Sequence, residues 1–227
     1  MNPTASFELD HVFIFISPTG SESSAFGDLG LVECSRWTHS GQGTSNVCYA
    51  FNNAYLEFIW VSNPNEIRSE LVSPLGLSER SRWKETNASP FGLGLRMTTS
   101  KRSRWPFKMF PYCPPYLRPG TSIQIAESER GPSIPLVFVV PNSSRPDSPA
   151  ALKKYPLDHP LGIRELTGVR IETPADELSA DQLTALRDLG ITLAFRAPGH
   201  RIELEFDHGA KGQRKNFHPT LPLAIFW

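Results

Sequence analysis

Prolines and glycines divide this chain into many short apolar runs, and that spacing limits the folds it can adopt. The 227 residues include 21 Pro and 16 Gly, which fall mostly between apolar runs. Because both residues interrupt regular elements and favour turns, the pattern is typical of short strands joined by turns rather than of a helical bundle. Hydrophobic residues make up 39% of the chain, which is enough for a buried core and argues against global disorder.

The charge balance and the cysteines exclude several classes of protein. Lys and Arg (23) offset Asp and Glu (23), so no net positive charge attracts nucleic acid. The basic cluster at 101–104 is interpreted as a solvated loop, because phosphate binding needs several spread contacts. The three cysteines show neither zinc-ribbon spacing nor a disulfide framework. With no apolar run near the roughly 18 residues of a membrane span and no visible signal peptide, we expect a cytoplasmic protein without nucleic-acid or membrane partners.

Alternating apolar residues predict the strands of the first unit, residues 1–62. The run 7–16 alternates and is rich in β-branched and aromatic residues, with Leu9, His11 and Phe13 on one face. A short helix and three strands are expected to follow, at 21–29, 31–37, 47–51 and 54–61. The order of elements in this unit is therefore β-α-β-β-β.

The rest of the chain is interpreted as an insertion followed by a second unit. Residues 63–158 are expected to hold three further strands and proline-rich loops. Residues 159–227 contain a capping box, Ser179 with Gln182, and are interpreted as a shortened β-α-β-β copy of the first unit with an apolar tail. The tail is expected to form a final strand or to pack against a partner subunit, so a homodimer is one arrangement left open.

His11 and Glu57 are the residues best suited to chemistry. His11 lies among apolar residues in mid-strand, where a buried imidazole bonded to a carbonyl is the ordinary interpretation. Glu57 lies between Leu56 and Phe58, and its desolvation is costly unless a metal, a cation or a hydrogen-bond donor meets it. An exposed face of an edge strand is the alternative for Glu57. Imidazole and carboxylate together are ligand types that Zn, Fe, Mn or Ni accept.

The ordered combination of these features resembles the vicinal oxygen chelate superfamily, which includes the glyoxalases, and in particular its glyoxalase-like domain proteins. The opening Leu-Asp-His-Val at 9–12, the loop at 40–44 and the glutamate of the fourth strand carry the resemblance. It is good over residues 7–62 and weaker over 162–207. The resemblance implies an α+β fold, in which repeated βαβββ modules form a curved, cup-like mixed β-sheet with few short helices.

The resemblance also implies a divalent metal (Zn, Ni, Fe or Mn) held by the first and last strands of each module. His11 and Glu57 match the two ligand positions of the first module. Glu205, or Glu203 on the same face, matches the last strand of the second module. Gly168 stands at the remaining position, so a three-ligand site completed by water and a metal-free cup both stay open.

A glycine-rich loop adds further candidates around the expected cup. His39 is interpreted as a general base or a substrate-binding group, with a surface turn residue as an equal alternative. The candidate substrate-binding residues are Gln42, Asn46, Tyr55 and Glu205. The tryptophans that could stack on a ligand are Trp37, Trp60, Trp83 and Trp105.

Two functions from different classes follow, each with a small-molecule ligand. The first is a metal-dependent lyase, isomerase or dioxygenase-type enzyme, with Glu57 and His39 as catalytic groups. The second is a metal-free protein of the same fold that binds or sequesters its ligand, as resistance proteins do. A carboxylate in an apolar strand opposite His11 favours the enzyme slightly, and the glycine at position 168 weakens that preference.

Overall fold

The computed structural model describes residues 7–17, 22, 24–98, 106–149, 151 and 154–227. These residues form an α+β fold with two mixed sheets, of eight and five strands, as expected for the fold class. The α-helices of the described residues are short: α1 (Ser24–Asp28), α2 (Leu77–Ser81), α3 (Trp83–Thr86) and α4 (Ala180–Arg187). Single 3-10 turns lie at η2 (Glu66–Arg68), η3 (Ser73–Leu75), η4 (Gly131–Ser133) and η5 (Asp207–Gly209).

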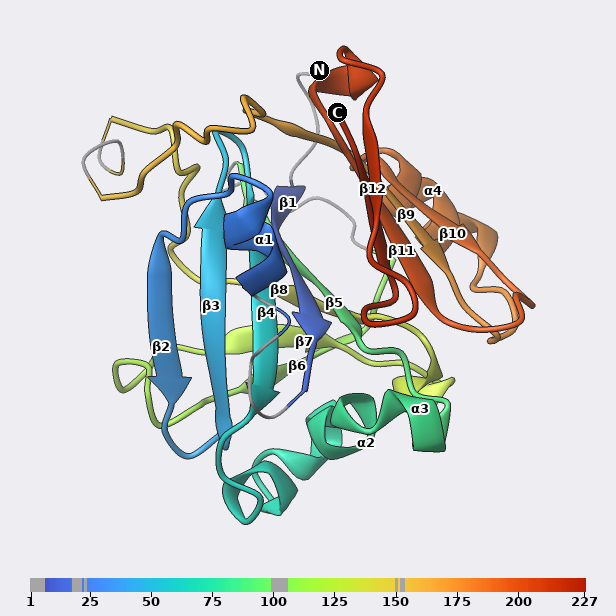
Figure 1. Ribbon diagram of the computed structural model, residues 1–227. Coiled ribbons are helices and arrows are strands. Elements are labelled where there is room, and N and C mark those ends of the chain that lie inside the picture. The colour runs from blue at the N-terminus through green and yellow to red at the C-terminus, as the bar shows by residue number, and fades with distance from the viewer. Residues whose placement is uncertain (1–6, 18–21, 23, 99–105, 150, 152–153) are drawn as a thin grey trace.

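The eight-stranded sheet consists of two halves that meet at β1 and β5. Its order is β2-β3-β4-β1-β5-β8-β7-β6, with β1 parallel to β4 and antiparallel to β5, and with β5 parallel to β8. The strands are β1 (Phe7–Phe15), β2 (Ser35–His39), β3 (Thr44–Ala50), β4 (Tyr55–Val61), β5 (Phe91–Met97), β6 (Met109–Tyr112), β7 (Ile123–Ala126) and β8 (Leu136–Val139). Each half repeats the same strand order outward from the β1–β5 pair, which gives the curved sheet that was predicted (Figure 1).

The second half of this sheet comes from residues 91–139, inside the segment interpreted above as an insertion. Strand β6 contains Pro111 and lies at the edge of the sheet, where a missing backbone N–H is tolerated. Because β5 pairs along the length of β1, that side of β1 is closed to any other strand. Residues 159–227, expected to complete the cup, form the separate five-stranded sheet instead.

A β-bulge in β1 decides which of its side chains face the cup. The register of β1 against β5 shifts between Leu9 and His11, and Leu9 packs against the core on the face opposite to His11. The expectation that Leu9, His11 and Phe13 share a face is therefore wrong for Leu9, because the irregular residue reverses the alternation. Below, the cup face is the one that carries His11 and Phe13, and the outer face is the one that carries Val12 and Ile14.

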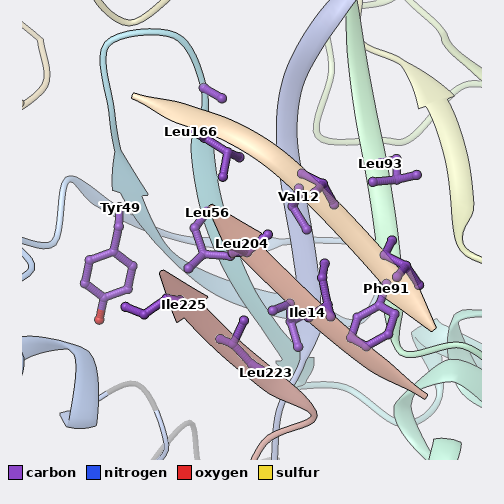
Figure 2. Packing of buried hydrophobic residues seen from close by; sticks show 14 of the residues in the cluster. Val12, Ile14, Tyr49, Leu56, Phe91, Leu93, Leu166, Leu204, Leu223 and Ile225 are labelled. Atoms are coloured by element: carbon purple, nitrogen blue, oxygen red, sulfur yellow. The ribbon is translucent and has the colours of Figure 1, made fainter. Parts of the chain in front are cut away.

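The five-stranded sheet covers the outer face. Its order is β10-β9-β11-β13-β12. The strands are β9 (Leu166–Glu172), β10 (Ile191–Ala194), β11 (Arg201–Phe206), β12 (Arg214–Asn216) and β13 (Leu223–Phe226). Leu204 and Leu223 lie with Val12, Ile14 and Leu56 in one buried cluster between the two sheets, so burial of apolar surface holds the layers together (Figure 2).

The segment between β4 and β5 closes one end of the cup, where α2 and α3 lie (Figure 1). Leu75 and Leu77 belong to the same apolar cluster as Phe13 on the cup face. Arg80 of α2 is buried and fixes this segment by donating to four backbone carbonyls, those of Leu75, Ser89, Pro132 and Ile134. Burial lowers the pKa of this guanidinium to about 9, and the carbonyl oxygens satisfy its donors.

Two local predictions for the C-terminal region are confirmed. Ser179 and Gln182 form the capping box at the start of α4, and the apolar tail forms β13, a final strand parallel to β11. The basic cluster at 101–104 lies outside the described residues. Within the part of the chain that is described, no helix has the length and apolarity needed to cross a membrane.

Candidate functional site

A cavity of about 200 Å³ lies on the cup face of the eight-stranded sheet. The first half of the sheet contributes its polar wall, made of His11, His39, Gln42, Asn46, Tyr55 and Glu57. The second half contributes a mainly apolar wall, made of Tyr112, Ile123, Ile125, Leu136, Phe138 and Val140. The structure thus brings together every site residue predicted from the sequence except Glu205.

His11 and Glu57 converge in this cavity from neighbouring strands. Strands β1 and β4 are parallel, and the Cα of Glu57 is the register partner of Phe13. His11 Nε2 lies 3.5 Å from Glu57 Oε2, and both side chains are buried. Asn46 Nδ2 donates a hydrogen bond of 2.5 Å to Glu57 Oε1. The separation of His11 and Glu57 exceeds that of a good hydrogen bond, so the pair has capacity for a third group.

Asp10 lies behind His11 and orients its ring. Asp10 Oδ1 is 2.7 Å from His11 Nδ1, while Arg96 and the Ser143 hydroxyl donate to Asp10 Oδ2. Burial raises the pKa of Asp10, but the hydrogen bonds from His11 and Ser143 and the charge of Arg96 outweigh it, and the pKa lies below its ordinary value. An ionised Asp10 can only accept, so His11 carries a proton on Nδ1 and turns Nε2 toward Glu57.

The ring of His11 is held between Tyr55 and strand β5. The His11 and Tyr55 rings are stacked, with centroids 4.3 Å apart and planes 14° apart. A Cβ atom at Gly94 would lie only 2.4 Å from His11 Cε1, and one at Gly92 only 2.0 Å from Phe13 Cε1. These two glycines of β5 therefore leave the space that the rings of β1 occupy.

The loop between β2 and β3 positions His39. Gly43 has a φ of +80°, and a Cβ there would lie 2.4 Å from the backbone oxygen of Asn63, so a side chain does not fit. His39 Nδ1 lies 3.0 Å from Thr44 Oγ1. Burial lowers the pKa of His39, although the charge of Glu57 acts in the opposite direction. His39 is therefore neutral near pH 7, as a base or a hydrogen-bond acceptor must be.

Gln42 connects the two halves of the sheet across the cavity. The hydroxyls of Tyr112 and Tyr116 each donate to Gln42 Oε1 at 3.1 Å, and Gln42 Nε2 donates to Thr44 Oγ1 at 2.8 Å. Burial raises the pKa of both tyrosines, so their hydroxyls keep their protons. Gln42 follows β2 and Tyr112 ends β6, and these strands are the two edges of the sheet.

Glu205 does not reach this cavity. It lies on β11 in the other sheet, is exposed, and lines a separate hollow with Gly168 and Glu203. The expectation that Glu205 or Glu203 completes a site with His11 is not met. The physical reason is the strand pairing, since residues 91–139 supply the second half of the cup.

The cavity does not offer the ligand set of a usual metal site. Gly94 is the register partner of His11 on β5, and the lining positions of β8 are Leu136 and Phe138, none of which binds metal ions. In the described part of the chain, no three or more His, Cys, Asp or Glu side chains group so that they could hold a metal ion. Catalytic zinc sites have about three protein ligands, whereas His11 and Glu57 supply two. The residues present therefore do not fit the metal that the resemblance implies.

The aromatic lining consists of rings other than the expected tryptophans. Trp37 is 66% exposed on the edge strand β2, and neither Trp60 nor Trp83 lines the cavity. Trp105 lies outside the described residues. The aromatic rings that line the cavity are those of Phe13, Tyr55, Tyr112, Tyr116 and Phe138.

Three residues of the site were not predicted from the sequence. Asp10 precedes His11 directly, and an acid in an apolar strand next to a histidine is a signal that could have identified it. Tyr112 and Tyr116 lie in the proline-rich run 111–119, which no periodicity assigns to the sheet. Their place opposite Gln42 follows only from long-range strand pairing.

Comparison with known proteins shows a solved structure of similar fold. No family model and no curated protein matches the sequence. A hypothetical protein from Staphylococcus aureus has a similar structure, with a TM-score of 0.55 at 10% identity, covering 96% of this chain and 98% of that chain. A mutant of 4-hydroxymandelate synthase from Streptomyces coelicolor has a TM-score of 0.45 at 10% identity, covering 89% of this chain and 71% of that chain. Methylmalonyl-CoA epimerase from Mycobacterium tuberculosis has a TM-score of 0.37 at 12% identity, covering 61% of this chain and 91% of that chain.

The likeness to the Staphylococcus aureus protein concerns the fold and not the activity, because the identity is only 10%. The paired half-sheets around β1 and β5 give the curved, cup-like mixed sheet that the sequence resemblance implies.

Proposed function

We propose that the cup binds a small, mainly apolar molecule whose polar group faces His11 and Glu57, without a bound metal ion. The observation that carries this proposal is the composition of the cavity wall, which is polar on the first half of the sheet and mainly apolar on the second. Such a wall is typical of small-molecule sites, where apolar contact supplies affinity and a few polar groups fix orientation.

The size of the cavity supports a ligand of about one substituted ring. A dry cavity of about 150 Å³ accepts benzene, so a cavity of about 200 Å³ has room for a ring and a short substituent. Ile125, Leu136 and Phe138 offer the apolar contact for such a ring. His11 and Glu57 line the same cavity, and the His11 ring meets Phe138 edge-on with centroids 5.2 Å apart, so the polar pair lies beside this apolar surface and within reach of the substituent.

Titration with benzyl alcohol, followed by calorimetry or by NMR, tests the binding proposal. We expect saturable binding to the purified protein. Ile123→Trp, which introduces an indole into the cavity, should abolish binding, whereas Leu71→Trp adds the same group at a residue outside the cavity and should not. Absence of binding, or binding that Ile123→Trp leaves unchanged, contradicts the proposal.

Thermal unfolding with added divalent ions tests the metal-free part of the proposal. A ligand that binds the native state raises its stability by mass action, so a metal held by His11 and Glu57 would raise the unfolding temperature. We expect Zn²⁺, Ni²⁺ and Mn²⁺ to cause no rise that His11→Gln removes. A rise that is present in the wild type and lost in His11→Gln would contradict this part.

Proton transfer on the bound molecule is a second candidate function, favoured by Asp10. A base whose second nitrogen is oriented by a buried carboxylate is the arrangement found where imidazole takes and returns protons. In the cup, His11 Nε2 and Glu57 would be the two groups that exchange a proton with the ligand, with Asp10 stabilising the imidazolium.

Exchange of carbon-bound protons in D₂O tests this second function. The probe is α-hydroxyacetophenone, which has acidic protons beside its carbonyl and a ring of suitable size. Wild-type protein should accelerate deuterium uptake, and His11→Gln should remove the acceleration while benzyl alcohol still binds. If the rate with wild-type protein equals the buffer rate, binding alone remains as the function.

A further inference from the structure

The cavity wall has more unused hydrogen-bond acceptors than unused donors. We infer that the ligand of the cup has a polar head that donates hydrogen bonds, a primary amine or a hydroxyl, and that it carries no anionic group. This inference rests on the proposed binding function and specifies its chemical class.

Four side chains of the wall already donate to protein acceptors. The two tyrosine hydroxyls, of Tyr112 and Tyr116, donate to Gln42 Oε1. The amide of Gln42 donates to the hydroxyl of Thr44, and that of Asn46 donates to Glu57 Oε1. Each of these bonds uses a proton that a carboxylate or phosphate ligand would need.

The acceptors of the wall are not saturated. Glu57 Oε2 lies 3.5 Å from His11 Nε2, and the proton of His11 is on Nδ1, bonded to Asp10. In the neutral ring with that tautomer, a lone pair of Nε2 faces a carboxylate oxygen, and a donor placed between them satisfies both. The oxygen atoms of Tyr112 and Tyr116 also keep accepting capacity.

The charges of the wall favour the same class of ligand. Among the described residues that line the cavity, none is Lys or Arg, and Glu57 is the only acidic one. Arg96 lies close by, but it is buried against Asp10 and Glu8, which offset its charge. A desolvated anion in the cavity would therefore meet a carboxylate and no cation, while an ammonium group would meet Glu57 and aromatic rings.

Three probes that share one ring separate the head groups: benzylamine, benzyl alcohol and benzoate. Calorimetric titration of the wild-type protein near neutral pH should give dissociation constants for benzylamine and benzyl alcohol at least tenfold below that for benzoate. Benzoate that binds as tightly as either of the others overturns the inference and leaves the proposed function intact. If none of the three probes binds, the proposed function and the inference both fail.

A charge variant and a matched control locate the preference. Glu57→Gln should weaken benzylamine at least tenfold, because it removes the carboxylate, and should weaken benzyl alcohol much less. Glu205→Gln removes an equivalent carboxylate from the other sheet and should change neither constant. Equal weakening of benzylamine in the two variants would show that long-range charge, and not the cavity wall, selects the ligand. The wild-type comparison of the three probes remains decisive if Glu57→Gln does not fold.

Discussion

The two halves of the eight-stranded sheet share a strand order but differ in what they place on the cup face. The half built from β1 to β4 carries two histidines, an asparagine and a glutamate toward the cavity. The half built from β5 to β8 places two glycines beside the rings of β1 and lines the cavity with isoleucine, leucine and phenylalanine. On the outer face the halves are alike, since both are apolar and both pack in the same cluster.

This difference shows that a repeated framework does not require a repeated site. The outer face of both halves is constrained by packing against the five-stranded sheet, so the same kind of side chain is needed in each. The cup face is free of that constraint, and one half can hold polar groups while the other supplies volume and apolar contact. Among the described residues, the second half adds no His, Cys, Asp or Glu to the cavity lining that could join His11 and Glu57 as a metal ligand.

The largest effect expected is on the outer face, and it should be equal in the two halves. Phe58 of β4 and Phe91 of β5 are both fully buried in the inter-sheet cluster. Phe58→Ala and Phe91→Ala should each lower the free energy of unfolding by about 3–5 kcal/mol, because each leaves a cavity in a packed core. Urea denaturation measures both, and a loss below about 1 kcal/mol for either one would break the equivalence.

The next largest effect on stability is expected at the glycines of β5, in the second half, which leave space for the rings of β1, in the first half. Gly94→Ala places a methyl group where the His11 ring lies and should destabilise the protein by about 1–3 kcal/mol. It should also shift the NMR signals of the His11 ring. Gly199→Ala is the matched control, since a Cβ at Gly199 meets no atom within 4 Å, and its effect should stay within about 0.5 kcal/mol. Equal effects would show that the space beside His11 is not tightly filled.

A smaller effect is expected for the polar wall of the first half. Asn46→Ala removes the donor to Glu57 Oε1 and the acceptor of the Trp37 backbone N–H. We expect a loss of about 1 kcal/mol, because water in the cavity can replace part of the lost bonding. In a Glu57→Gln background the loss should be smaller, since the uncharged amide needs its partner less. A double-mutant cycle measures the difference, and strict additivity would contradict the coupling.

The smallest effect expected is the dependence of stability on pH through His39. Its pKa is lowered mainly by burial, so the unfolded chain takes up a proton more readily than the native protein. The stability that neutral His39 provides is complete above its ordinary pKa of 6.5 and is lost as the pH falls below that value. The difference in unfolding free energy between wild type and His39→Gln should therefore shrink between about pH 7.5 and 5.5. A difference that grows on acidification would reverse the assigned direction.

Local sequence patterns predicted much of the fold and the polar wall of the site, but not its apolar wall. The alternation in 7–16, the capping box at Ser179 and the apolar tail each depend on residues close in sequence, and each gave the right element. The pairing of β5 with β1 depends on segments about 80 residues apart and on a bulge, which no local pattern encodes. The expectation that Glu205 lines the cup is wrong for that reason, because it places residues 159–227, interpreted as a shortened copy of the first unit, beside that unit in the cup.

The hydrogen bonds at Gln42 have a mechanical consequence. The two edge strands of an open sheet normally move independently. Here the amide oxygen of Gln42, in the loop after the edge strand β2, accepts a hydrogen bond from Tyr112 at the end of the other edge strand, β6. Because this bond links the two edges, any motion that flattens the sheet also widens the mouth of the cup. Hydrogen exchange at the amides of β2 and β6 should accordingly slow together when a ligand occupies the interior.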